Sequence, residues 1–171
     1  MKIFENVNVI VFTILLSILT ISCDKEEKAN STDTVLFEMA KDTAGYKWFK
    51  NSSSLLDKSA GSAHPQPFLR TRYNSVAATM LDTNGKIKAG SVFPEGSVVV
   101  KELFSSEATL GRFAILYKSE NNENADDKGW VWGYVNADGS ISESSSNKGK
   151  SCIGCHSQSG NIDYMLMNKF F

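Results

Sequence analysis

The stretch SVVVKELF, residues 97–104, decides the fold of this chain. Valine and phenylalanine, which dominate it, are enriched in β-strands. Two stretches of similar character follow it, LGRFAILY at 110–117 and WVWGYV at 130–135, and FLRTRYN at 68–74 precedes it. Ile141 begins a short fifth strand. Because these strands follow one another through turns and polar connections, the sequence predicts an antiparallel sheet.

The pattern within SVVVKELF brings a charge to each face of that strand. Side chains alternate between the two faces of a strand, so Lys101 lies with Val99 and Leu103, and Glu102 lies on the other face. If the Lys101 face is buried, desolvation lowers the pKa of its amine. If Glu102 faces inward instead, Lys101 is an ordinary surface lysine.

Helices are expected on both sides of the strand region. Residues 34–50 carry apolar side chains at helical spacing and predict one amphipathic helix, bent at Gly45. Residues 161–171 predict a closing helix whose apolar stripe includes Met165 and Phe170. The expected fold class is therefore α+β: a mainly antiparallel sheet with an N-terminal helix, a C-terminal segment that carries the motif described next, and a short helix.

The motif is CIGCH, residues 152–156, and a C-x-x-C-H run is the attachment signature of a c-type haem. Cys152 and Cys155 would each add to one vinyl group of a single covalently bound haem, and His156 would become the axial iron ligand. The alternatives are a redox disulfide and half of a zinc site. The sequence shows no βαβ setting for the first, and only His64 and Cys23 remain as nitrogen or sulfur ligands for the second.

The N-terminus reads as an export signal. Val7 to Ile21 is almost wholly apolar, but the run is short for a transmembrane helix, which favours a signal peptide over residues 1–22. Because the run ends in Ser22-Cys23, we expect a lipoprotein with its lipid on Cys23, followed by a flexible tether over residues 23–33. An ordinary signal peptide cleaved nearby and an uncleaved anchor are the alternatives.

Cysteine usage and charge fit that interpretation. One cysteine is assigned to lipid and two to haem, and none of the three is left over. Since haem c is attached outside the cytoplasm in bacteria, the expected location is a membrane-anchored lipoprotein at the periplasmic face or the cell surface. Residues 34–171 form a single haem domain of ordinary size. The formal net charge of −1 argues against a nucleic-acid partner.

The position of CIGCH excludes two common cytochrome layouts. Small cytochromes c carry the motif near the N-terminus with a distant methionine ligand, whereas only 15 residues follow His156 here. Four-helix cytochromes c′ carry it near the C-terminus, but the predicted strands do not fit a helical bundle.

The sequence resembles the cytochrome P-460 family, which includes the β-sheet cytochromes c′. Three segments carry the resemblance: HPQPFLRTRYNSVA at 64–77, FPEGSVVVKE at 93–102, and GWVWGYV at 129–135 followed by a serine-rich loop and CIGCH. It covers roughly residues 34–171. The resemblance implies a mainly antiparallel sheet, a C-terminal c-type haem with five-coordinate iron, and a homodimer. It also implies oxidation of hydroxylamine, sometimes with nitric oxide, or binding of nitric oxide and other small gases.

The resemblance also assigns site residues. Cys152, Cys155 and His156 match the haem-binding residues fully. Lys101 matches a lysine that bonds to the haem ring in the true P-460 enzymes, Arg70 or Arg72 the arginine over the distal face, and Glu143 the distal carboxylate. The gas-binding branch instead caps the iron with phenylalanines, and four are available: Phe68, Phe93, Phe104 and Phe113. The structural alternatives are a solvated sheet-edge lysine, surface arginines and a loop carboxylate.

Three functions therefore compete at the level of sequence. The first is a mono-haem enzyme that acts on hydroxylamine or nitric oxide, with a redox partner protein. The second is a gas-binding protein with the same open iron and an apolar distal wall. The third is an electron carrier, in which a second side chain ligates the iron; the candidates are His64, Met80, Met165 and Met167.

Overall fold

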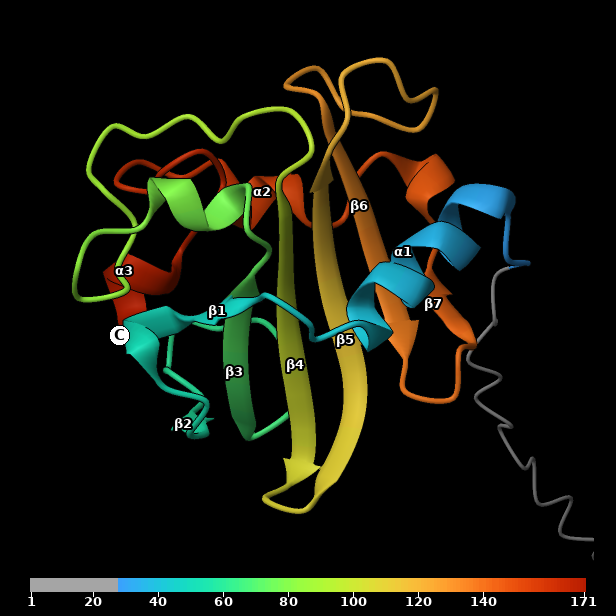
Figure 1. Cartoon of the computed structure of the whole chain (residues 1–171). Helices are drawn as coiled ribbons and strands as arrows, with labels where there is room; N and C mark the ends of the chain where they lie inside the picture. Colours follow the sequence, from blue (N-terminus) through green and yellow to red (C-terminus); the bar gives the residue numbers. More distant parts are fainter. Residues whose placement is uncertain (1–27) are drawn as a thin grey trace, which may run out of the picture.

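An antiparallel sheet forms the centre of the computed structural model, which describes residues 28–171 (Figure 1). The strands of its main path are β1 (Lys47–Trp48), β3 (Phe68–Tyr73), β4 (Val98–Ser106), β5 (Thr109–Lys118), β6 (Trp130–Asn136) and β7 (Ile141–Glu143), in that order across the sheet. A short strand, β2 (Leu56–Asp57), pairs with the other end of β3. The five predicted strands and the α+β fold class are confirmed. The predicted signal peptide, Cys23 and the first part of the tether lie outside the described residues.

The register of the sheet gives each of its faces a distinct set of side chains. Thr71 of β3 lies opposite Lys101 of β4, which lies opposite Ala114 of β5, and the row continues through Tyr134 to Glu143. Residues directly opposite each other in an antiparallel sheet share a face. This row therefore crosses one face from β3 to β7. Arg72 and Val100, one position along, lie on the other face.

Apolar residues bury both faces of the sheet. On the face of the Lys101 row, Val99, Leu103 and Trp132 pack against the C-terminal segment. On the other face, Val100 and Ile115 pack beneath the N-terminal helix. A strand covered on both sides needs apolar residues at successive positions, which explains the three consecutive valines of β4.

The N-terminal helix, α1, spans Ser31–Lys41 and lies across the sheet (Figure 1). Asn30 and Asp33 form a capping box, in which the Asp33 backbone N–H donates to Asn30 Oδ1 at 2.9 Å and the Asn30 N–H donates to Asp33 Oδ2 at 3.1 Å. The helix therefore begins three residues before the predicted start, within the stretch expected to be a tether. Leu36 and Ala40 are its fully buried contacts with the sheet.

The predicted helix over 34–50 is wrong in its second half. The chain leaves the helix at Asp42, turns at Gly45 with φ of +72°, and pairs as β1 with β3. Arg72 of β3 donates to the backbone oxygens of Ala40 and Asp42, so a neighbouring strand satisfies the carbonyls at the helix end. Aromatic residues that suggested a continuing helical stripe lie instead in an extended segment.

The predicted closing helix over 161–171 is also wrong in extent. The C-terminal region contains the one-turn helices α2 (Ile153–His156) and α3 (Met167–Phe170), separated by a tight turn at residues 162–165. The apolar spacing of this segment arises because its side chains line a cavity rather than one helix face. Short 3₁₀ helices complete the described elements: η1 (Phe49–Asn51), η2 (Ala77–Met80) and η3 (Ser145–Asn147).

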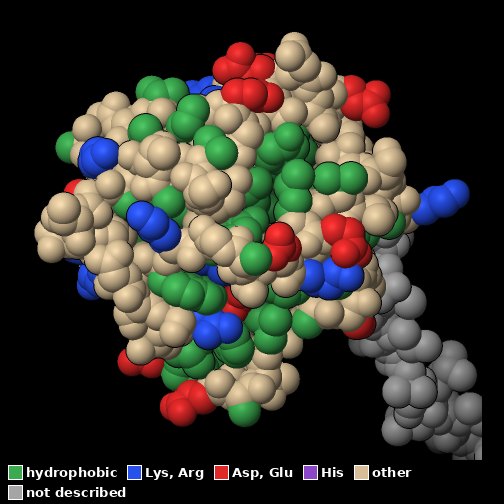
Figure 2. Space-filling model, in the orientation of Figure 1, with side chains coloured by type: hydrophobic (Ala, Val, Ile, Leu, Met, Phe, Trp, Pro, Cys, Tyr) green, Lys and Arg blue, Asp and Glu red, His purple; other side chains and the backbone are tan. Residues whose placement is uncertain are grey.

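Acidic and basic side chains are intermingled on the surface seen from the side of α1 (Figure 2). Within residues 28–171, no helix combines the length and apolar character needed to cross a bilayer.

Candidate functional site

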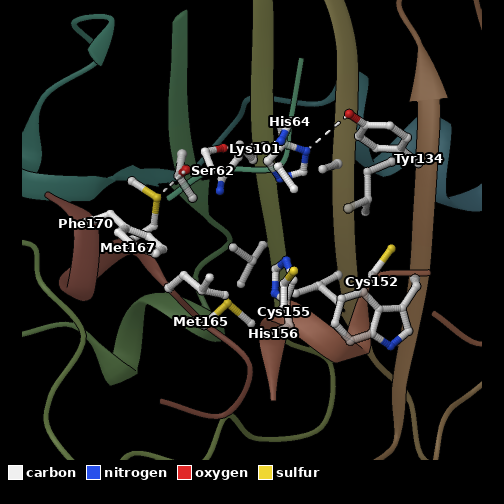
Figure 3. Close-up of a pocket in the computed structure, with 18 of the residues that line it drawn as sticks. Ser62, His64, Lys101, Tyr134, Cys152, Cys155, His156, Met165, Met167 and Phe170 are labelled. Atoms are coloured by element: carbon white, nitrogen blue, oxygen red, sulfur yellow. Dashed lines mark hydrogen bonds between the residues drawn. The ribbon is translucent and has the colours of Figure 1, made fainter. Parts of the chain in front are cut away.

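A cavity of about 290 Å³ lies on the face of the sheet opposite α1 (Figure 3). The row of side chains from Thr71 to Glu143 forms its floor. Residues 59–65 and two C-terminal segments, 151–156 and 165–171, contribute most of the remaining lining residues. Segments that are far apart in the sequence thus meet around one cavity. Cys152, Cys155 and His156 of CIGCH therefore lie beside the centre of the sheet.

Both cysteines of CIGCH line this cavity with free thiols; Cys152 is the N-cap residue of α2, and Cys155 lies within its single turn. Gly149 allows the backbone that leads into the motif to pass close to Trp132 of β6, because its φ is +68° and a Cβ there would lie 2.6 Å from the Trp132 indole. The Gly149 carbonyl accepts hydrogen bonds from the backbone N–H groups of Cys152 and Ile153, at 2.8 and 2.9 Å, and so starts the helical turn. The motif is therefore held close to β6.

His156 has one ring nitrogen engaged and the other left for a ligand. Its Nδ1 lies 2.7 Å from the backbone oxygen of Tyr164, so Nδ1 carries the proton and donates it. Burial lowers the pKa of His156 to about 4, which leaves the imidazole neutral with a lone pair on Nε2. Trp132 packs edge-on against the ring at 5.1 Å between centroids. A neutral histidine oriented by a backbone carbonyl is the usual form of an iron ligand.

A strained turn holds the carbonyl that orients His156. Ile162 and Met165 exchange backbone hydrogen bonds, and the two residues between them, Asp163 and Tyr164, have φ of +44° and +70°. This is the backbone of a primed hairpin turn, which usually requires Asn-Gly. The Asp163 carboxylate anchors it by accepting from the Phe93 backbone N–H at 2.8 Å and from the indole N–H of Trp130 at 3.1 Å.

Both donors to Asp163 are buried in the core. Phe93 and Trp130 are 1% and 0% exposed, so neither N–H has water as an alternative partner. No Asn-Gly signal marks the turn in the sequence, and the region was predicted to be helical. The carboxylate at position 163 is the only local hint, because aspartate tolerates the left-handed region better than most residues.

Lys101 projects into the cavity from the middle of β4 (Figure 3). Its side chain keeps partial exposure only because it borders the open space, and protein surrounds it otherwise. Burial lowers the pKa of its amine to about 8, well below that of an ordinary lysine. Among residues 28–171, no carboxylate lies within ion-pair distance of it. The amine is thus an unpaired, partly neutral nitrogen in the pocket.

Two further predicted residues lie in the same pocket. Glu143 of β7 lines it beside Cys152. Burial raises the pKa of the Cys152 thiol, and the nearby Glu143 carboxylate raises it further. His64, expected to be a loop residue or a sixth iron ligand, also lines the pocket, with Nδ1 3.2 Å from the hydroxyl oxygen of Tyr134. Sequence patterns did not single out Tyr134 as a site residue.

Comparison with known protein families agrees with this geometry. Residues 43–167 match the family described as Cytochrome P460. The chain belongs to the cytochrome P460 family. Membership makes it a haem cytochrome, and the matched region contains CIGCH, His64, Lys101, Tyr134 and Glu143. No curated protein and no solved structure matches the chain significantly.

The residues of this P460-family chain fit a haem. Two thiols one helical turn apart and a neutral histidine nitrogen face one cavity, and apolar side chains supply most of its surface. Among them are Met165, Met167 and Phe170. A zinc site has no such support, since residues 28–171 contain no group of three or more His, Cys, Asp or Glu side chains arranged to hold a metal.

Arg70 and Arg72 do not lie over this pocket. Since Lys101 pairs with Thr71, the arginines on either side of Thr71 point to the opposite face of the sheet. There Glu102 accepts from Arg70 Nε at 2.6 Å and from Arg72 Nε at 2.8 Å. The expectation that Arg72 covers the distal face of a P460 haem is therefore wrong, and its role here is to neutralise Glu102 and close the end of α1.

The phenylalanines expected to cap the iron are elsewhere as well. None of Phe68, Phe93, Phe104 and Phe113 lines the cavity. Phe93 stacks on Tyr73 in the core, and Phe113 lies under α1. Phe170 and Phe171, at the end of the chain, line the cavity instead. Of the alternative iron ligands, Met165 and Met167 reach it with His64, and Met80 does not.

Proposed function

We propose that this member of the P460 family is an exported, mono-haem c-type cytochrome whose iron keeps an open position for small nitrogen compounds, hydroxylamine or nitric oxide. One observation carries the proposal: Cys152, Cys155, His156 and the amine of Lys101 all line a single cavity. That arrangement supplies attachment, an axial donor and a basic nitrogen around one space.

The two thiols support the proposal that one haem c is attached covalently. Cys152 and Cys155 are separated by one helical turn and both border the cavity, so each would form one thioether to the same haem edge. His156 would ligate the iron through Nε2, because Nδ1 is already committed to Tyr164. Because His156 directly follows Cys155, the same helical turn would hold both a point of haem attachment and the iron ligand.

The chain's own groups would bind substrate and move its protons. When bound, the haem supplies an iron that binds the nitrogen compound and passes its electrons to a redox partner protein. With a pKa of about 8, the Lys101 amine is able to accept a proton near neutral pH. Glu143 is the carboxylate available for a second proton transfer at the β7 side of the cavity.

The second candidate function is binding of a small gas without turnover. The apolar lining near the chain end favours it, since Met165, Met167 and Phe170 present apolar side chains to that part of the cavity. In this reading Lys101 and Glu143 stay unreactive. A simple electron carrier remains the third function, with His64, Met165 or Met167 on the iron.

Export and assembly are proposed from the sequence. A signal peptide over residues 1–22 and a lipid on Cys23 would anchor the domain to a membrane at the periplasmic face or cell surface. The family resemblance adds a homodimer. These proposals give the haem domain a location where covalent attachment and exchange with small diffusible compounds both occur.

The decisive experiment is spectroscopy on the purified, haem-loaded domain. A c-type pyridine haemochrome, retention of haem in acid–acetone and a high-spin ferric EPR signal are expected. His156→Ala should retain the thioether-bound haem but lose the native iron spectrum. Extraction of the haem by acid–acetone would refute covalent attachment, and a low-spin ferric signal would refute the open position. Hydroxylamine supplied with an electron acceptor then separates the enzyme from the gas-binding protein.

A further inference from the structure

A second histidine in the pocket is held by a defined partner. His64 lies in the loop between β2 and β3 and borders the same cavity as Lys101 and His156. Its Nδ1 is 3.2 Å from the hydroxyl oxygen of Tyr134, and the two labelled side chains face each other across the top of the pocket in Figure 3. Among the described residues, no hydrogen bond involves the other ring nitrogen, Nε2.

Arg112 decides which way the hydrogen bond between His64 and Tyr134 points. Its guanidinium lies 4.6 Å from the centre of the Tyr134 ring, and its positive charge opposes the rise in the Tyr134 pKa that burial causes. Asn136 fixes it in place by accepting from Arg112 Nε at 2.7 Å. A guanidinium has donors and no acceptor, so the phenol proton finds no acceptor on Arg112 and is directed toward His64 Nδ1.

The ionisation of the pair agrees with that direction. Burial raises the pKa of Tyr134, which therefore keeps its proton. Burial, with a smaller contribution from the charge of Lys101, lowers the pKa of His64 to about 3, so the imidazole is neutral. A neutral imidazole that accepts at Nδ1 carries its hydrogen on Nε2. The pocket thus contains an N–H donor that no other described residue uses.

We propose that His64, oriented by Tyr134 and Arg112, donates a hydrogen bond from Nε2 to the small ligand in this pocket and selects ligands with an acceptor atom. Such ligands include azide and nitrogen oxides, whereas carbon monoxide accepts hydrogen bonds poorly. The inference deepens the proposed function and rests on it. It makes His64 a residue that determines ligand specificity, not an iron ligand. Tyr134 becomes a positioning residue and not only part of the cavity lining.

The test measures dissociation constants of the haem-loaded domain for azide in the ferric state and for carbon monoxide in the ferrous state. His64→Leu should weaken azide about 10- to 100-fold, because the lost hydrogen bond is to an anion, and should change carbon monoxide binding by less than about threefold. His64→Gln keeps an N–H near the same place and should restore most of the azide affinity. Tyr134→Phe should weaken azide about 3- to 10-fold.

A matched control and the ferric spin state keep the inference separate from the proposed function. Tyr117→Phe, on the opposite face of β5, should leave both constants unchanged. If wild type binds azide and His64→Leu binds it equally well, the inference is overturned while the open site stands. If wild type is low-spin and His64→Leu becomes high-spin, His64 is an iron ligand, and both the inference and the open site are overturned.

Discussion

His156 Nδ1 lies 2.7 Å from the backbone oxygen of Tyr164, eight residues further along the chain. That oxygen belongs to a turn whose two central residues both have positive φ. Two non-glycine residues in the left-handed region cost free energy, and such strain persists only where surrounding contacts hold it. Here the contacts are those of the Asp163 carboxylate with the buried N–H groups of Phe93 and Trp130. The orientation of the predicted iron ligand therefore depends on an aspartate that does not touch it.

The first prediction is that Asp163→Ala destabilises the fold and disturbs His156. Two buried donors lose their acceptor, which should lower the free energy of unfolding by about 2 to 4 kcal/mol. Asp163→Asn keeps one acceptor oxygen and should lose less. Urea titration measures the stability, and the iron–histidine Raman band of the ferrous protein reports on His156. Asn168→Ala removes a comparable anchor, at Ile87, and should lower stability without moving that band.

The second prediction is that Arg72 stabilises the fold and does not affect the pocket. Arg72 is fully buried, and Glu102 neutralises it on the face of the sheet away from the cavity. Removing one partner of a buried ion pair costs about 3 to 5 kcal/mol, so Arg72→Met should lower the unfolding free energy by that amount. The haem spectrum and azide affinity of the folded variant should be unchanged. Arg112→Met should change the haem spectrum and azide affinity and should leave the unfolding free energy nearly unchanged. A change in the haem spectrum of Arg72→Met, with none in Arg112→Met, would contradict the assignment.

The sheet was predictable because its signals are local. Valine-rich and aromatic stretches between polar connections marked each strand, and CIGCH marked the haem-binding segment. Strand register was not predictable, because a shift of one residue moves every side chain to the other face without changing the pattern of the strand itself. Arg72 was assigned to the distal face for that reason: only its pairing with Val100 shows that it faces away from Lys101.

Contacts between distant segments account for the other gaps. Tyr134 meets His64 across 70 positions of sequence, and no spacing rule connects them. The helix over 34–50 was overextended because Tyr46 and Trp48 supply apolar residues where a helical stripe would, although they alternate in an extended segment. The turn at 162–165 lacked an Asn-Gly signal because Asp163 secures it through partners in the core.

The third prediction concerns Cys23, which lies outside the described residues. If residues 1–22 are a lipoprotein signal peptide, Cys23 becomes the first residue of the mature protein and carries lipid. Growing expressing cells with a fatty-acid probe should label the wild-type protein, and Cys23→Ala should carry no label. The haem content of the two proteins should be the same, because Cys152 and Cys155 are untouched. Equal labelling of both proteins would rule out lipid at this position.

The last prediction is that Lys101 forms a covalent bond to the haem ring. The nucleophile in such a reaction is the neutral amine, which an ordinary lysine supplies only in trace amounts at neutral pH. With a pKa of about 8, roughly one-tenth of the Lys101 amine is neutral at pH 7 and about nine-tenths at pH 9. Burial lowers the pKa because it disfavours the charged form of the amine. Cross-linking should therefore increase as the pH at which the protein matures is raised through 8.

Forming the nitrogen–carbon bond removes one hydrogen from the amine and one from the ring carbon, so an electron acceptor must be present. Mass spectrometry after proteolysis should find the peptide containing Lys101 joined through one haem to the CIGCH peptide, with two hydrogens fewer than the separate species. Lys101→Arg keeps a cation but remains protonated, and should yield only the CIGCH peptide on the haem. Lys47→Arg, at an exposed lysine of β1, should leave the joined peptides intact. If wild-type protein matured at pH 9 gives only the haem-bearing CIGCH peptide, Lys101 acts as a free amine, and the gas-binding function gains over hydroxylamine oxidation.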